Sequence, residues 1–309
     1  MIYALLAYLC WGFFPIYWKL LKHVPLLEIL SQRVLWAFVF YTILLSVKNK
    51  RLFFFKPANK KSMFILAIAS ILLMANWLIY IYAVNSNQIL EGSLGYFINP
   101  LFNILLGVIV LKEKLTKDQI IAVAMATVGV GIITLNNGHL PWIALVLAST
   151  FCLYGYLKKL SSATGAESNQ FESVLFIPLA LGALVFSLFF STTGSTDFIT
   201  NSTNNFNSIH SYTFFYDLKT WALFIGSGIV TGLPLIFFSE AARRIPYYLM
   251  GFFQFLAPTL QFMTGVLIFN EAVTTWKLIG FGFIWAGIVW LIARKVIEIR
   301  QIKISYIKQ

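Results

Sequence analysis

Two apolar stretches of this chain carry polar side chains at helical spacing, and their amides and hydroxyls could bind a small polar molecule. In the first stretch the polar and small residues fit within an arc of about 120° at 100° per residue: Ser93, Tyr96, Asn99, Asn103 and Gly107. In the second they lie on a narrower arc: Gly251, Gln254, Pro258, Gln261 and Gly265. A single amide in a membrane helix more often joins two helices by a hydrogen bond, whereas two matching stripes favour a shared cavity.

The two stripes belong to an internal repeat. Segments 94–116 and 250–274 read LGYFINPLFNILLGVIVLKEKLT and MGFFQFLAPTLQFMTGVLIFNEAVT, and Asn103 matches Gln261. The same offset of 158 residues relates four further pairs: Pro100 and Pro258, Gly107 and Gly265, Glu113 and Glu271, and Thr116 and Thr274. Each copy lies in a half of the chain with five apolar runs. Because five is odd, we expect a five-helix repeat over residues 1–137 and an inverted one over 138–309, an arrangement typical of transporters.

The composition predicts an all-α membrane protein. Hydrophobic residues are 59% of the 309 residues, charged residues are 11% and the mean hydropathy is +0.81, which excludes a soluble domain. The runs are continuous rather than alternating, so they predict helices and not barrel strands. Ten runs approach the roughly 20 residues that a span needs: Ile2 to Leu21, Leu27 to Val47, Met63 to Val84, Gly92 to Leu111, Gln119 to Leu135, Leu140 to Leu157, Val174 to Phe190, Trp221 to Ser239, Tyr247 to Phe269 and Leu278 to Ile297.

Basic residues indicate the orientation in the membrane. Most of the 23 Lys and Arg fall in loops on the side of both termini, and Lys158 and Lys159 are counted among them. The positive-inside rule therefore predicts that both termini are cytoplasmic. The net charge of +12 reflects this topology and contact with anionic lipid rather than nucleic-acid binding. The hydrophilic stretch 192–218 is expected to be an outward, mobile loop, with a small lid as the sharper alternative.

One charge, Arg33, lies inside an apolar run, about 7 Å from its outward end at 1.5 Å per residue. Charge at depth is costly unless it is paired or hydrated. Glu91, at the outward end of the fourth run, is the candidate partner, and the pair would form an outer gate or bind an anionic group. The alternative is that Arg33 extends to the interface. Pro100 and Pro258 would bend their helices, which suits gating, or are simply tolerated there.

Aromatic residues could complete a cavity wall, although Trp and Tyr near span ends also serve as interface anchors. The candidates for this wall are Trp11, Asn76, Trp77, Tyr80, Tyr96 and Tyr154. No acid is expected at mid-depth, because Glu91 and Glu172 are placed near opposite span ends. Since proton-driven carriers usually hold such an acid, its absence favours facilitated diffusion or exchange over proton antiport.

The sequence carries no pattern for catalysis. It has no H-E-x-x-H motif, no P-loop, no pair of intramembrane aspartates, and no Ser and His on facing runs. Cys10 and Cys152 lie mid-run as small apolar residues, and the histidines lack metal-ligand spacing. We therefore expect no catalytic residue, metal or cofactor. Thr116 and Gln119 predict a capping box at a helix start.

Several strings, spread from Ala7 to about Trp290, identify a family resemblance. They are AYLCWGFFPIYWKL, VPLLEILSQRVLWAF, ANWLIYIYAVN, EGSLGYFINPLFNILLG with EKLT, and GFFQFLAPTLQF. With these strings the chain resembles the RarD-type proteins of the EamA family, in the drug/metabolite transporter superfamily. The resemblance implies two packed five-helix repeats, a central cavity, and permease activity at the bacterial inner (plasma) membrane. It implies no particular substrate.

The expected function is that of a permease for small metabolites or amphipathic drug-like molecules, working as a facilitator or exchanger. A membrane-embedded receptor or scaffold and a proton-coupled drug efflux antiporter are the alternatives. The expected partners are membrane lipid and a small-molecule substrate, with no nucleic acid, and a homodimer remains an open alternative.

The orientation is testable by thiol labelling after Cys10 and Cys152 are replaced. Single cysteines are introduced at His139 and Ser208, which are expected outside, and at Lys60 and Glu167, which are expected inside. An impermeant thiol reagent applied to whole cells should label only the first pair. Labelling of Lys60 or Glu167 from outside would overturn the orientation.

Overall fold

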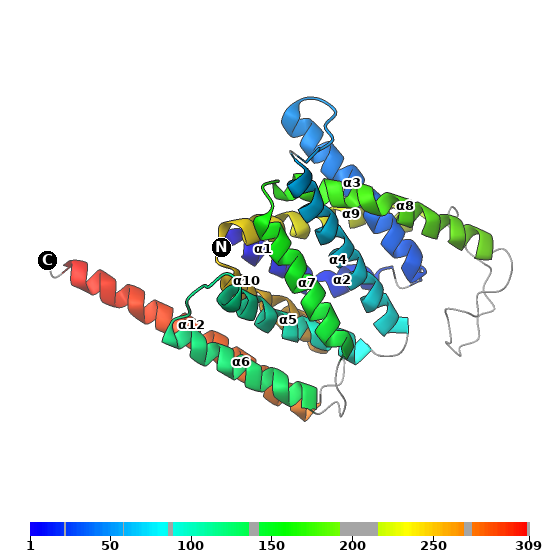
Figure 1. Ribbon diagram of the computed structural model, residues 1–309. Helices are drawn as coiled ribbons and strands as arrows, with labels where there is room; N and C mark the ends of the chain where they lie inside the picture. The colour runs from blue at the N-terminus through cyan, green and yellow to red at the C-terminus, as the bar shows by residue number, and fades with distance from the viewer. Residues whose placement is uncertain are drawn as a thin grey trace.

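A computed structural model describes residues 1–21, 23–57, 59–85, 89–135, 142–191, 216–268 and 274–307 (Figure 1). These residues form helices and contain no strand, so the all-α prediction is confirmed. The helices are α1 (Ile2–Gly12), α2 (Phe14–Lys19), α3 (Leu26–Asn49), α4 (Lys60–Asn85), α5 (Ile89–Ile109), α6 (Lys117–Leu135), α7 (Trp142–Leu160), α8 (Gly165–Ser191), α9 (Leu218–Arg244), α10 (Tyr247–Gln254), α11 (Leu256–Leu267) and α12 (Thr275–Ile307).

Length and hydropathy identify the spanning helices. Within the described residues, seven helical segments are long and apolar enough to cross a membrane, and one of them joins α10 to α11. Residues Gly95–Ile109 and Leu278–Arg294 form shorter apolar helices. The chain is therefore a multi-pass membrane protein, while the count of ten spans, their inverted order and the side of the termini stay predictions. The predicted outward loop lies outside the described residues except at its end, 216–218.

Two of the predicted spans are broken helices. One break is at Phe13, between α1 and α2, and the other is at Phe255, between α10 and α11. A proline follows each break: Pro15 and Pro258 have no N–H for the carbonyl four residues earlier, and the ring also crowds that carbonyl. Pro100, in contrast, lies inside the uninterrupted α5.

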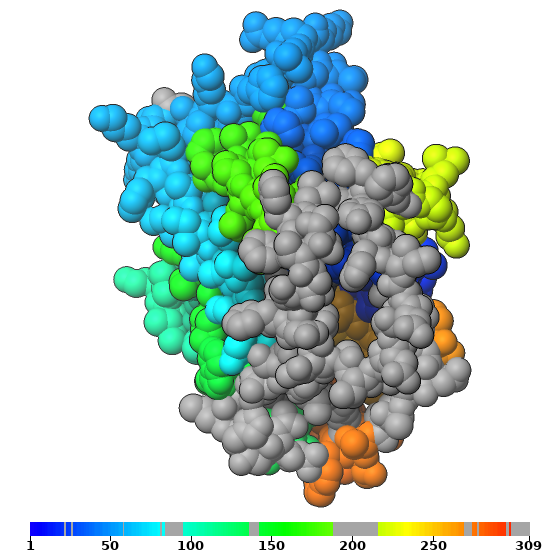
Figure 2. All heavy atoms as spheres, turned by 90° about the vertical axis from the view of Figure 1, so that its right-hand side faces the viewer, coloured from blue at the N-terminus to red at the C-terminus, as the bar shows by residue number. Residues whose placement is uncertain are grey.

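Helices from the two halves of the chain pack directly on one another. The main contacts are α6 with α12, α3 with α8, α5 with α7, α4 with α7, α3 with α9, α5 with α10 and α1 with α9. In Figure 2 the green atoms of the second half lie against blue and cyan atoms of the first half. Helices that are distant in the sequence are thus neighbours in the fold.

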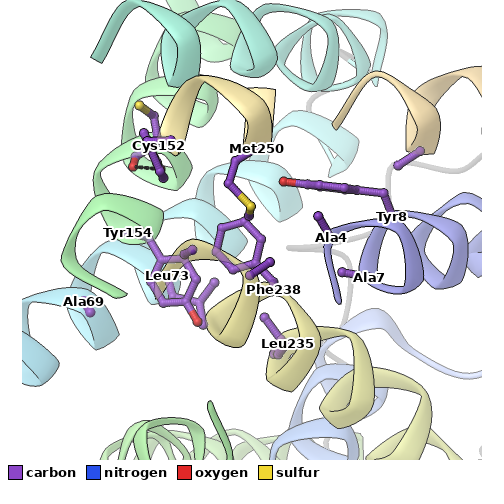
Figure 3. Packing of buried hydrophobic residues seen from close by; sticks show 14 of the residues in the cluster. Ala4, Ala7, Tyr8, Ala69, Leu73, Cys152, Tyr154, Leu235, Phe238 and Met250 are labelled. Carbon is purple, nitrogen blue, oxygen red and sulfur yellow. Dashed lines mark hydrogen bonds between the residues drawn. The ribbon is translucent and has the colours of Figure 1, made fainter. Parts of the chain in front are cut away.

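An aromatic cluster fills the main core. The rings of Tyr8, Trp11, Phe151 and Tyr154 have centroids 5.2–6.4 Å from that of Phe238. Figure 3 shows Tyr154 and Phe238 close to Met250, and Tyr8 approaching from α1. Buried aromatic rings contribute large apolar areas, and their contacts add about 0.5–1.5 kcal/mol per pair. The cluster therefore ties α1, α7, α9 and α10 together.

Two glycines allow a close backbone contact between α6 and α12. A Cβ atom at Gly129 would lie 2.4 Å from the Gly280 carbonyl oxygen, and one at Gly280 would lie 2.7 Å from the Gly129 carbonyl oxygen. Small residues at such positions let membrane helices approach closely and pack by van der Waals contact.

Gly129→Ala should lower the melting temperature of the purified protein, because the opposing backbone cannot give way without separating the helices. We expect a cost of about 1–3 kcal/mol in the free energy of unfolding, typical of overpacking. Gly131→Ala is the matched control on the same helix, since its Cβ would meet nothing within 4 Å. Thermal unfolding in detergent measures both variants. Equal melting temperatures for the two would contradict this close contact.

Candidate functional site

A buried ion pair joins α7 to α8. The Lys158 ammonium pairs with the Glu172 carboxylate, and the two side chains are only 1% and 3% exposed. Lys158 also donates to Ser168 Oγ at 2.9 Å and to Asn169 Oδ1 at 2.6 Å. Tyr154 donates its hydroxyl to the second Glu172 oxygen at 3.2 Å. Each charge thus has an opposite charge and further hydrogen bonds, which is the condition for burying a pair at tolerable cost.

A partly buried charge, Arg33, is positioned by α3 and α9. Its Nε donates to Thr231 Oγ1 at 3.1 Å. Its guanidinium carbon lies 4.5 Å from the Trp18 ring centroid and 5.2 Å from that of Trp77, within the range of cation–π attraction. Ion pairs among the described residues form at Lys158, Arg243, Arg244 and Arg294, and none of them includes Arg33.

Arg33 and Glu172 line one small cavity. Each lies seven residues after the first residue of its helix, or about 10 Å along the axis. The polar part of the wall adds Tyr41, Asn169, Ser173 and Thr231. The free space is about 10 Å³, which is close to the minimum for one water molecule. In this conformation the cavity is too small for a metabolite.

A larger and almost entirely apolar pocket lies beside this cavity. It has a volume of about 70 Å³, and it is formed by side chains of α3, α4 and α8. The cavity and the pocket share Val34, Trp77 and Phe176 in their walls. Trp77 and Phe176 are in ring contact, with centroids 5.7 Å apart. These side chains are therefore the partition between a polar and an apolar space.

Only part of the residue set expected from the sequence gathers around Arg33. Trp77 lines both spaces, and Tyr154 reaches Glu172. Tyr80 and Tyr96 contact each other edge to face, with centroids 5.9 Å apart. The side chain of Glu91 lies outside the described residues, so its predicted pairing with Arg33 is untested.

The amides of the two stripes join helices. Asn103 donates to Gln254, and both are buried where α5 meets α10. Gln261 donates to the Trp11 carbonyl at 2.9 Å, the group to which Pro15 cannot donate. These bonds favour the helix-joining interpretation, while a cavity role for Asn103 and Gln261 stays a prediction.

Three further candidates either bond to a neighbouring helix or are buried: Asn76, Asn99 and Pro100. Asn76 on α4 donates to the Leu147 carbonyl at 2.8 Å and to Thr150 Oγ1 at 2.9 Å, both on α7. Asn99 is buried, and its Oδ1 has no hydrogen-bond partner among the described residues. Pro100 is buried on α5, and its carbonyl faces Gly251 of α10 closely enough that only glycine fits there.

The sequence interpretation of Lys158 was wrong. Lys158 was counted as a loop residue, but it is buried in the last turn of α7. Glu172 is buried in α8, seven residues after its first residue, and its predicted place near a span end stays a prediction. The predicted runs ended at Leu157 and resumed at Val174, because the polar segment between them reads as a loop by hydropathy. No sequence signal indicated this burial, because the segments EILSQR from Glu28 and ESNQFE from Glu167 share only their first residue when they are aligned.

Lys158→Met should strongly destabilise the protein, because it leaves the Glu172 carboxylate buried without its partner. The expected loss is about 3–5 kcal/mol in the free energy of unfolding. Lys158→Met combined with Glu172→Gln should recover much of that loss. Lys159→Met is the matched control; its ammonium is half-buried and donates to the carbonyls of Ala242 and Ile245, so a smaller loss is expected. Denaturant or thermal unfolding measures all four proteins, and no recovery in the double variant would contradict the pairing.

Comparison with known proteins places the chain in a family. Residues 1–135 match the model of the EamA-like transporter family. The chain is 38% identical to "Uncharacterized transporter YojE" of Bacillus subtilis over 292 residues, which cover 93% of this chain and 91% of the relative. It is 37% identical to "Protein RarD" of Escherichia coli K12, with 92% and 90% covered. It is 26% identical to "Chloramphenicol-sensitive protein RarD" of Pseudomonas aeruginosa, with 89% and 87% covered.

A solved crystal structure has the same fold. It superposes with a TM-score of 0.66 over 94% of this chain and 96% of that chain, at 13% sequence identity. A sequence identity this low supports only a shared fold. The Bacillus subtilis and Escherichia coli relatives are 38% and 37% identical to this chain over most of its length, which also shows the family. The chain belongs to the EamA-like transporter family, as a RarD-type member.

Proposed function

We propose that this protein is a permease of the bacterial inner membrane that moves small metabolites or amphipathic drug-like molecules between its two halves, as a facilitator or exchanger. The observation that carries the proposal is the polar and charged cavity around Arg33 and Glu172 inside a bundle of apolar helices. Charged residues at membrane depth are costly, and they mark substrate or ion pathways far more often than they serve packing.

The helix contacts support an inverted repeat. If the first half comprises α1 to α6 and the second half α7 to α12, then α3 and α8, α5 and α10, and α6 and α12 are repeat mates, and each pair is in contact. The contact of α4 with α7 has its counterpart in that of α9 with α1. This pattern is expected when a two-fold axis in the membrane plane relates the halves.

Transport requires another conformation than this one. The central space of about 10 Å³ is closed to a metabolite, so the two halves must separate on one side at a time. The breaks at Phe13 and Phe255 interrupt the helical hydrogen bonds of two neighbouring spans, and α1 and α11 are in contact. Breaks of this kind let half-helices move with little loss of backbone bonding.

The buried Glu172 supports proton antiport as an alternative, since a carboxylic acid inside a membrane protein can bind and release a proton. In this conformation, however, Glu172 forms a neutral pair with Lys158. It could exchange a proton with solvent only after that pair separates. A carrier without proton coupling therefore remains the preferred function, and a receptor or scaffold remains the third candidate.

Flux measurements in proteoliposomes test the proposal. A panel of amino acids, nucleosides and amphipathic antibiotics is presented with and without a pH gradient. We expect saturable uptake of at least one compound without a gradient, and faster uptake when the same compound is loaded inside. Flux that needs the gradient and is lost in Glu172→Gln would favour the antiporter. The absence of flux across the panel, in protein that melts cooperatively, would count against a permease.

A further inference from the structure

We infer that Arg33, Trp18 and Trp77 bind the head group of a small organic anion, and that the apolar pocket between α3, α4 and α8 receives its body. The inference rests on the permease function proposed above and names its substrate class. It is carried by the charge balance of the cavity, by the unused donors of Arg33, and by the pocket on the other side of Trp77.

The charge balance of the cavity favours an anion. Glu172 is neutralised by Lys158. Arg33 has no carboxylate partner among the residues that the structure describes. The site therefore carries one positive charge in excess, in surroundings that screen it poorly. A cationic ligand would be repelled, and an anionic ligand would supply the missing counter-charge.

The guanidinium geometry suits a planar oxyanion. Thr231 occupies only Nε, and the terminal nitrogens of Arg33 have no hydrogen-bond partner within the described part of the chain. These two nitrogens can bind both oxygens of a carboxylate or sulfonate in parallel, which is the preferred geometry of arginine with such groups. The rings of Trp18 and Trp77 hold the guanidinium in place without neutralising it.

The adjoining pocket fits an apolar body rather than a second polar group. Apart from Ser31, its wall consists of apolar side chains such as Leu30, Met74, Leu179 and Ala183. Val34, Trp77 and Phe176 line both this pocket and the cavity. Rotation of the Trp77 side chain would join the two spaces. An inorganic anion would leave the apolar pocket unused, so an organic anion accounts for both halves of the site.

Binding to purified wild-type protein in phosphatidylcholine nanodiscs tests the head group without any substitution. The probes are 4-phenylbutyrate, 4-phenylbutanol and 4-phenylbutylammonium, which share one body, and butyrate, which has the head without the phenyl group. Titration calorimetry should give the tightest binding for 4-phenylbutyrate, by about tenfold over the alcohol and the amine. Butyrate should bind more weakly than 4-phenylbutyrate. Equal affinities for anion and alcohol, or preference for the amine, would overturn the inference.

Substitutions locate the site. Arg33→Gln should weaken 4-phenylbutyrate binding by about tenfold or more and leave 4-phenylbutanol unchanged, and Arg33→Lys should fall between the two. Arg294→Gln is the matched control, because it removes the same charge from an exposed ion pair between Arg294 on α12 and Asp118 on α6. Equal losses in Arg33→Gln and Arg294→Gln would refute the site.

The lipid is the competing source of an anionic head group. Loss of 4-phenylbutyrate binding in phosphatidylglycerol nanodiscs would assign the site to lipid and overturn its assignment to a small free anion. Binding is measured separately from flux, so a failure of this inference can be told apart from a failure of the permease proposal. Anion binding without transport would contradict the permease function alone. Transport of neutral or cationic compounds without anion binding would contradict this inference alone.

Discussion

Lipid hydrocarbon offers no hydrogen bond to a polar group, so each polar group buried in this bundle needs a partner from the chain itself. The break after α1 illustrates the constraint. Pro15 cannot donate to the Trp11 carbonyl, and the amide of Gln261, distant in sequence, donates to it beside a backbone N–H of the helix cap. In the same way Glu113 accepts from the first backbone amides of α10, at Tyr247 and Tyr248. Contacts between the halves therefore supply partners for backbone groups at a break and at a helix start.

The same constraint explains why the charged residues are few and connected. Lys158, Glu172 and Tyr154 satisfy one another across α7 and α8. Arg33 stands opposite without such a partner among the described residues, although it and Glu172 each lie seven residues after the first residue of their helices. Two related positions thus carry opposite charges, and only one of them is neutralised by a neighbour. A carrier with this asymmetry would present different electrostatic surroundings to a ligand on its two sides.

Local patterns in the sequence were sufficient for some of these features. The capping box at Thr116 is present, with the Thr116 amide 2.8 Å from Gln119 Oε1, because both partners lie within one turn. The apolar runs predicted the helical class for the same reason. Lys158 was misjudged because hydropathy scores a lysine near a run's end as solvated. Its burial depends on Glu172, Ser168 and Asn169, which reach it only when α8 folds back on α7.

The contact of α6 with α12 has a consequence for biogenesis. α6 packs chiefly on α12, which begins at Thr275, about 140 residues after α6 ends at Leu135, and Gly129 has its closest fit with Gly280 of that helix. At about 5–20 residues per second, α6 would wait on the order of ten seconds in the membrane before its partner emerges. During that interval its glycine-bearing face is open to lipid or to another newly made helix. A ribosome that stops before α12 would therefore leave α6 with one unmatched surface, a feature by which membrane quality control could recognise the truncated chain.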